Sequence, residues 1–161
     1  VKTLHSEGTP GQVAAGVALG AALGLTPIAN VHNVVIVILL VVLNVSFAAA
    51  LFAWAAFIPL GFVFDPLFER LGRHLLVETS ALRPLWTAWD NTPGLALTNF
   101  NNTVVLGSVV AWMLLAAPIF VLARTGVIRY RTTIGERVRR THLYKAITAT
   151  RVYNVYRWFD A

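Results

Sequence analysis

The sequence predicts an all-α integral membrane protein, and three of its features lead to that class. Of its 161 residues, 57% are hydrophobic and only 12% are charged, and the mean hydropathy is +0.68. Soluble domains carry about 25% charged residues, so this chain lacks the polar groups to cover a water-exposed globule of its size. The second feature is a series of four apolar stretches, and the third is a strongly basic C-terminal end.

Residues 13–25 form the first apolar stretch, which as a helix is about 20 Å long at 1.5 Å per residue. This is shorter than the roughly 30 Å hydrocarbon core of a bilayer. Gly16, Gly20 and Gly24 lie four residues apart in it and form a bare stripe along one helix face. In lipid, small residues at this spacing let two backbones approach closely. We expect the stripe to pack on the transmembrane helix of a partner. The alternative is a flexible apolar helix with incidental glycines.

A second apolar stretch covers residues 28–43 and would be about 24 Å long as a helix. Pro27 prevents a regular continuation from the first stretch and favours extended geometry at Thr26. Two short helices around a proline turn predict a broken hairpin over residues 13–43. We expect this hairpin to be re-entrant, and thinned or tilted full spans are the alternative.

The tip of this hairpin carries a cluster of polar and turn-forming residues: Thr26, Pro27, Asn30, His32 and Asn33. One interpretation is that they cap the two helices and satisfy the backbone groups that the proline frees. The other is that they line a site for a lipid headgroup or a polar solute between broken helices. The two interpretations are compatible with each other.

The third stretch, residues 47–64, is long enough to span the bilayer with little tilt. Pro59 and Gly61 predict a kink in it, and Asp65-Pro66 ends its regular apolar character. From there on the sequence is mixed, with apolar residues at helical spacing and with tryptophans, which favour the headgroup level. We expect residues 65–102 to be an amphipathic segment at the membrane interface rather than a soluble domain.

The fourth stretch, residues 103–123, is the second spanning helix, and it completes a single membrane domain over residues 1–126. The remaining tail, residues 127–161, alternates basic with apolar side chains, which predicts basic amphipathic helices on an anionic leaflet. The residues expected to contact anionic lipid are Arg129, Arg131, Arg137, Arg139, Arg140 and Lys145.

The placement of charge predicts the orientation in the membrane. From Arg124 onward, nine Lys or Arg residues stand against Glu136 and Asp160, a local balance of +7 in a chain whose net charge is +6. Basic segments beside a spanning helix stay on the cytoplasmic side. The hairpin returns the chain to its starting side in either form, so we expect both termini at the cytoplasmic face of a bacterial inner membrane. Nucleic-acid binding is a competing explanation of the tail, and the preceding apolar stretch argues against it.

The sequence offers little chemistry for catalysis. It contains no cysteine, and its four histidines include no pair three or four residues apart, so a metal site has no support. A phosphate-binding loop, a nucleophile elbow and an acid–base pair are also absent. We therefore expect no enzyme activity, no cofactor and no metal. His32 is the only ionisable candidate at a depth suited to proton-coupled transport.

A short sequence repeat occurs in two parts of the chain. Thr9-Pro10-Gly11 recurs as Thr92-Pro93-Gly94, and an Asn-rich turn follows each, at residues 30–33 and 99–102. Inverted repeats are common in transporters. A three-residue match also arises by chance, so both explanations stay open.

The string SEGTPGQVAAGVALGAALGLTP, followed by an apolar run that ends in Leu43-Asn44, resembles a bacterial membrane family, the family of unknown function 2062. The shared pattern is a helix with spaced glycines, a Thr-Pro break, a second apolar helix and an Asn before the third. The later string NTPGLALTNFNNTVVLGS is similar to longer members, which are typically encoded beside a large membrane-anchored protein related to AsmA-like bridge proteins. Those β-rich proteins are associated with moving phospholipid between bacterial membranes, and the family has no established catalytic residues.

This resemblance, together with the residue pattern, predicts a non-enzymatic inner-membrane subunit of a hetero-oligomer. It would pack on the transmembrane helix of an AsmA-like partner, contact phospholipids and provide the membrane end of a phospholipid-transfer bridge. Two alternatives stay open. One is a small-solute channel or transporter subunit with a path lined by Thr26, Asn30 and His32, and the other is a purely structural anchor.

Overall fold

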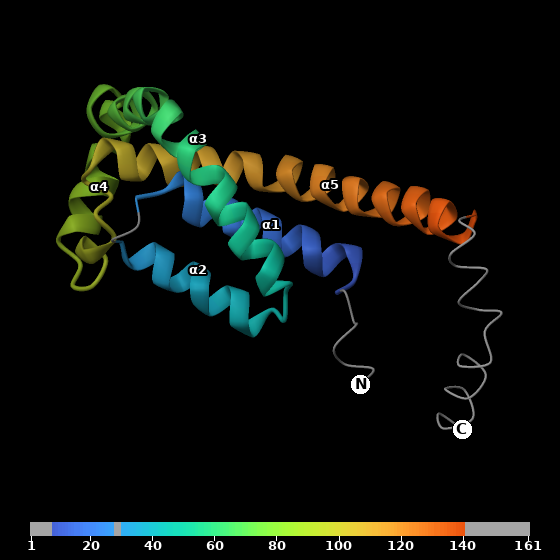
Figure 1. Ribbon diagram of the computed structural model, residues 1–161. Coiled ribbons are helices and arrows are strands. Elements are labelled where there is room, and N and C mark those ends of the chain that lie inside the picture. Colours follow the sequence, from blue (N-terminus) through green and yellow to red (C-terminus); the bar gives the residue numbers. More distant parts are fainter. Residues whose placement is uncertain (1–7, 28–29, 141–161) are drawn as a thin grey trace. The chain divides into compact units, whose positions relative to one another are not determined.

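The computed structural model describes residues 8–27 and 30–140, with side chains described up to residue 133, and every regular element in these ranges is helical (Figure 1). The chain divides into two units, Val1–Arg124 and Thr125–Ala161, and the packed helices belong to the first. Two helices in the described part are long and apolar enough to cross a membrane. The predicted all-helical class, with two helices long and apolar enough to span a membrane, is therefore confirmed.

The broken hairpin consists of α1 (Pro10–Leu25) and α2 (Val31–Val42). A capping box starts α1. The backbone N–H of Gln12 donates to the Thr9 hydroxyl at 3.2 Å, and the backbone N–H of Thr9 donates to Gln12 Oε1 at 2.8 Å. Helix α1 ends at Thr26, whose extended backbone follows from the proline behind it. At the other end of α2, Asn44 takes the left-handed conformation with φ of 49°, which turns the chain into the next helix.

Helix α3 (Phe47–Arg73) continues through both Pro59 and Pro66 and passes into a π-helical turn, η2 (His74–Glu78). The regular helix therefore reaches Arg73, beyond the end at Phe64 that the Asp65-Pro66 pair indicated. Each proline removes only one backbone donor. A continued helix still satisfies the other backbone groups, which is required where no water can bond to them.

A compact segment joins α3 to the last helix and contains η3 (Ser80–Leu82), α4 (Arg83–Asp90) and η4 (Ala96–Thr98). Its two tryptophans bond within the segment. The Trp86 indole donates to the Leu75 carbonyl at 2.9 Å, and the Trp89 indole donates to the Thr98 hydroxyl at 3.0 Å. The segment therefore has its own fixed structure, whatever surface it lies on.

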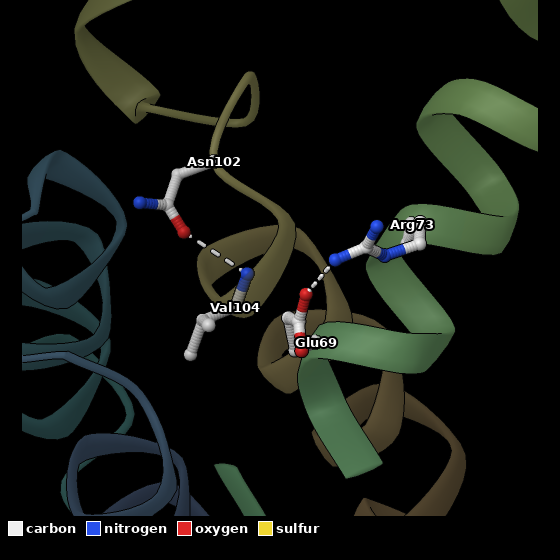
Figure 2. Close-up of polar contacts among 4 residues, drawn as sticks. All are labelled: Glu69, Arg73, Asn102 and Val104. Atoms are coloured by element: carbon white, nitrogen blue, oxygen red, sulfur yellow. Dashed lines mark hydrogen bonds and ion pairs between the residues drawn. The ribbon is translucent and has the colours of Figure 1, made fainter. Parts of the chain in front are cut away.

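The last helix is α5 (Thr103–Arg140), which exceeds the predicted range of 103–123. Asn102 caps its first turn, because its Oδ1 accepts from the Val104 amide at 2.9 Å (Figure 2). The same oxygen also accepts from the Val105 amide at 3.2 Å. The same view shows the Arg73 guanidinium paired with Glu69 at the end of α3.

Helix α5 also includes most of the basic residues assigned to anionic lipid. Arg129 and Arg131 have described side chains, whereas only the backbone is described at Arg137, Arg139 and Arg140, and Lys145 lies outside the described residues. Their contact with anionic lipid stays a prediction.

The glycine stripe of α1 packs on α3 of the same chain. A Cβ atom on Gly16 would collide with the carbonyl oxygen of Ser46, and one on Gly20 would lie 2.9 Å from the Cα of Ala50. A Cβ on Gly24 would lie 2.8 Å from the carbonyl oxygen of Trp54. Such distances mean that the two backbones touch, as expected for small residues in a membrane helix pair.

This contact corrects the expectation that the stripe packs on another protein. All three glycines are buried, and the surface that covers them is α3, so the stripe is not open to a partner helix. Close packing was predicted by the spacing, and the identity of the covering helix was not.

A second glycine contact joins α3 to α5. A Cβ on Gly72 would lie 2.6 Å from the carbonyl carbon of Thr103, and one on Gly107 would lie 2.7 Å from the carbonyl carbon of Phe68. The two helices therefore meet backbone to backbone where α5 begins, and they run in opposite directions. Further along, the Trp112 indole donates to the Ala18 carbonyl at 2.9 Å, which ties α5 to α1.

Most of the apolar surface of the long helices faces outward. Only 17% of the most apolar window of the first candidate span, Phe47–Glu78, is buried, and 22% of that of the second, Thr103–Thr133. Phe52 is 77% exposed and Leu114 is 71% exposed. A helix from the core of a soluble protein would be mostly buried, so these outward faces fit a hydrocarbon surrounding.

Candidate functional site

The polar residues of the hairpin tip first of all close the break between α1 and α2. The Thr26 hydroxyl lies 2.8 Å from both the Ala22 carbonyl oxygen and Asn33 Oδ1, and its single proton can serve either acceptor. Asn33 Nδ2 donates to the Pro27 carbonyl at 2.7 Å. Thr26 and Asn33 are 4% and 6% exposed, so these bonds satisfy groups that would otherwise be buried without partners. The capping interpretation therefore describes these two residues.

Asn30 connects the tip to a distant turn. Its Nδ2 donates to the Pro27 carbonyl at 3.0 Å, and its Oδ1 accepts from Asn99 Nδ2 at 2.7 Å. Asn99 can point its side chain there because its backbone is left-handed, with φ of 55°. The two Asn-rich turns of the sequence thus bond to each other, and the hairpin reaches the end of the bundle at which α3 is joined to α5.

His32 lies on the same turn of α2, beside an aromatic pair. Its ring centroid is 6.2 Å from that of Phe100, which stacks on Trp89 at 5.5 Å. Neither ring nitrogen of His32 has a hydrogen-bond partner among the described residues, although both nitrogens are buried. Burial lowers the pKa of His32 below its ordinary value, and the nearby backbone of Thr98 raises it by a smaller amount.

The lowered pKa of His32 makes stability depend on pH in a defined direction. The folded chain favours the neutral ring, whereas the unfolded chain takes up a proton near pH 6.5, so stability is lost as the pH falls through 6.5. We expect His32→Gln to have a smaller drop in unfolding temperature between pH 7.5 and 5.5 than the wild type, in thermal melts of purified protein in mild detergent. An equal drop in both proteins would contradict the assignment.

An apolar cleft of about 440 Å³ lies between α1, α2 and α3. Its walls are aliphatic and aromatic side chains, and Asn30 and Asn33 supply its polar end; the apolar lining includes Leu23, Val34, Val37, Leu40, Leu51 and Trp54. Ligand pockets of proteins have volumes of roughly 300–1,000 Å³ and the same apolar lining with few polar groups. This cleft, here called the hairpin cleft, has the character of a site for an aliphatic chain that ends in a polar group.

A second cleft of about 420 Å³ lies on the other side of the end of α1, against α3 and the start of α5. Thr26 and Pro27 line it together with Gly61, Val104 and Asp65. The five tip residues include no carboxylate, and α3 brings Asp65 to the end of α1 from 39 residues after Thr26. This cleft is called the Asp65 cleft.

Sequence reasoning thus found the tip and missed residues that complete it. Asn99 and Asp65 are separated from the tip by many residues. For Asn99, the asparagine-rich turn was a sign in the sequence of its link to the tip, and for Asp65 there was no such sign. The sequence also contains no sign that Gly61, Gly72 and Gly107 make close backbone contacts, because they lie singly, without a repeat of four. In the described part of the chain, no three His, Asp or Glu side chains are placed to hold a metal ion.

These features define the class as an all-helical protein with a broken N-terminal hairpin, whose glycines pack on the first of two helices that are long and apolar enough to span a membrane. The chain belongs to the bacterial family described as "Uncharacterized protein conserved in bacteria (DUF2062)", whose model matches residues 1–134. It is 28% identical over 146 residues to an uncharacterized protein of Treponema pallidum (strain Nichols), covering 89% of this chain and 88% of the relative. No solved structure matches the chain significantly.

Proposed function

We propose that this protein is a non-enzymatic subunit of the bacterial inner membrane that holds phospholipid for a larger membrane-anchored partner of the AsmA-like class. The observation that carries the proposal is the hairpin cleft. It joins an apolar wall to a polar end, which is the division between the acyl chain and the headgroup of a phospholipid.

The outward faces of α2 and α3 support the same function. Val34, Val37 and Leu51 line the cleft and are themselves about half exposed, so the cleft is open toward the surroundings of the helices. An acyl chain could therefore enter sideways from the bilayer. Burying each CH₂ group of such a chain contributes about 0.8 kcal/mol when the alternative is water. When the acyl chain comes from the bilayer instead of water, this gain in free energy is smaller. The polar end of the cleft is therefore needed for selectivity.

The arrangement in the cell is part of the proposal. Both termini are cytoplasmic, the basic residues from Arg124 onward lie on the anionic leaflet, and residues 65–102 lie at the periplasmic interface. Since α3 covers the glycine stripe, the partner's transmembrane helix packs on an outward apolar face and not on the stripe. In this arrangement the hairpin tip is at the periplasmic end, where a bridge would receive lipid.

Filling the hairpin cleft tests the function. Val37→Trp places an indole in the cleft, so we expect the phospholipid retained after extraction into mild detergent to fall about tenfold, the equivalent of roughly 1.4 kcal/mol. Native mass spectrometry of the purified protein counts the retained lipid. The matched control is Leu114→Trp, a change of similar size on α5 at a side chain that lines neither cleft.

Three outcomes separate the candidate functions. Loss of lipid in Val37→Trp alone supports the proposal. A wild-type protein that holds no lipid and still co-purifies with a large membrane-anchored protein would make it a structural anchor. Solute flux through proteoliposomes, unaffected by Val37→Trp, would instead favour the channel.

A further inference from the structure

We propose that the Asp65 cleft binds the primary ammonium group of an aminophospholipid, with the carboxylate of Asp65 as the acceptor. This goes further than the proposed function, on which it rests, because it names a headgroup class. It concerns a cleft and a residue different from those that carry the proposed function.

The depth of Asp65 in the bilayer is the first argument. The apolar stretch that precedes it, residues 47–64, is about 27 Å long as a helix, close to the roughly 30 Å of the hydrocarbon core. Asp65 therefore stands where the hydrocarbon ends and phospholipid headgroups begin. A carboxylate at this depth meets headgroups rather than acyl chains or bulk water.

The state of the carboxylate is the second argument. Asp65 is half-buried, and among the described residues the ion pairs join Arg73 to Glu69 and His74 to Glu78, so none includes it. Arg70, the cation nearest in sequence, is not in an ion pair with it either. A half-buried carboxylate is stabilised most by a donor that also carries positive charge.

The walls of the cleft are the third argument. Apart from Asp65 and Thr26 its lining is apolar or backbone, from residues such as Leu25, Ile58 and Phe62. Phe62 is 74% exposed, so the cleft opens on a face that meets acyl chains. A ligand that fits must be an amphiphile with a cationic end. A phospholipid with an ammonium group has this chemistry, and an anionic headgroup would be repelled.

Lipid selectivity tests the assignment. The full chain is reconstituted in nanodiscs of equal parts phosphatidylethanolamine, phosphatidylcholine and phosphatidylglycerol, extracted into mild detergent and examined by native mass spectrometry. Phosphatidylcholine has the same phosphate but no N–H donor, so the ratio of the first two lipids reports the ammonium contact. We expect wild type to favour phosphatidylethanolamine over both others, and Asp65→Asn to lose about tenfold of that preference, as for a hydrogen bond to a charged group.

Two further variants keep the result interpretable. Asp65→Glu preserves the charge and should keep the preference, and Asp90→Asn removes an exposed carboxylate of α4 outside the cleft and should change nothing. Unfolding temperatures of all variants show whether a loss comes from misfolding. If Asp65→Asn fails to fold, a lost preference in Asp65→Glu or Asp90→Asn would overturn the assignment, as would equal retention of phosphatidylethanolamine and phosphatidylcholine by wild type.

The outcomes also separate this inference from the proposed function. Lipid retained by wild type without headgroup preference overturns the ammonium site and leaves the lipid-holding function standing. No retained lipid of any kind removes both. An unchanged preference in Asp65→Asn, together with loss of a co-purifying protein, would assign the carboxylate to a lysine or arginine of that partner and overturn the lipid assignment.

Discussion

Gly107→Ala should separate α5 from α3 and destabilise the protein by about 3 kcal/mol, the upper part of the range for overpacking. The added Cβ would lie 2.7 Å from the carbonyl carbon of Phe68 and 3.0 Å from the amide nitrogen of Gly72, far inside the roughly 3.5–4.0 Å of an ordinary contact. Both neighbours are backbone atoms, so neither can move aside by a side-chain rotation. Thermal unfolding in mild detergent measures the loss.

The matched control for this variant lies in the same helix. At Gly126 an added Cβ meets no atom within 4 Å, so Gly126→Ala should be neutral or slightly stabilising, since alanine is the better helix former by about 1 kcal/mol. Equal unfolding temperatures for the two alanine variants would show that α3 and α5 are not in backbone contact.

The second large effect is expected at the centre of the glycine stripe. Gly20→Leu adds a branched side chain where the Cα of Ala50 already lies 2.9 Å from the position of a Cβ. We expect α1 to leave α3 altogether, with a loss of more than about 3 kcal/mol in unfolding free energy and with little folded protein recovered. Resistance to protease and the thermal midpoint of the purified chain measure the effect.

This variant also distinguishes an internal contact from an external one. If the stripe were a surface for another protein, Gly20→Leu purified alone would keep its full stability and lose only the partner. Since α3 covers the stripe, we expect instability in the isolated chain. Gly11→Ala, in the first turn of the same helix, is the control, because the added Cβ would lie 3.9 Å from its nearest neighbour, the Thr9 hydroxyl.

The local features of the helices followed closely from the residue pattern. The Thr26-Pro27 pair ended α1, as expected from the bias toward extended geometry that a proline places on the residue before it. Apolar stretches produced the helices, and the spacing of Gly16, Gly20 and Gly24 indicated a close backbone contact. The course of α3 through Pro66 was harder to foresee, since a proline ends a helix in water more often than in lipid.

The contacts between distant parts of the chain could not be read in the same way. Asn30 bonds to Asn99 across 69 residues, and Asp65 enters a cleft with Thr26 only because α3 crosses the end of α1. The direction of that crossing depends on glycines of both helices, including Gly61, where a Cβ would lie 2.7 Å from the Gly24 carbonyl oxygen.

By itself the sequence determined the helical class, the broken hairpin, the basic end and the presence of a small-residue face, because each depends on residues close together in the chain. The tertiary structure alone decided which helix covers that face, and which carboxylate and which asparagine complete the tip. The physical reason is that periodicity reports the shape of one helix face. The surface that fits against it is selected by the packing of all the helices together.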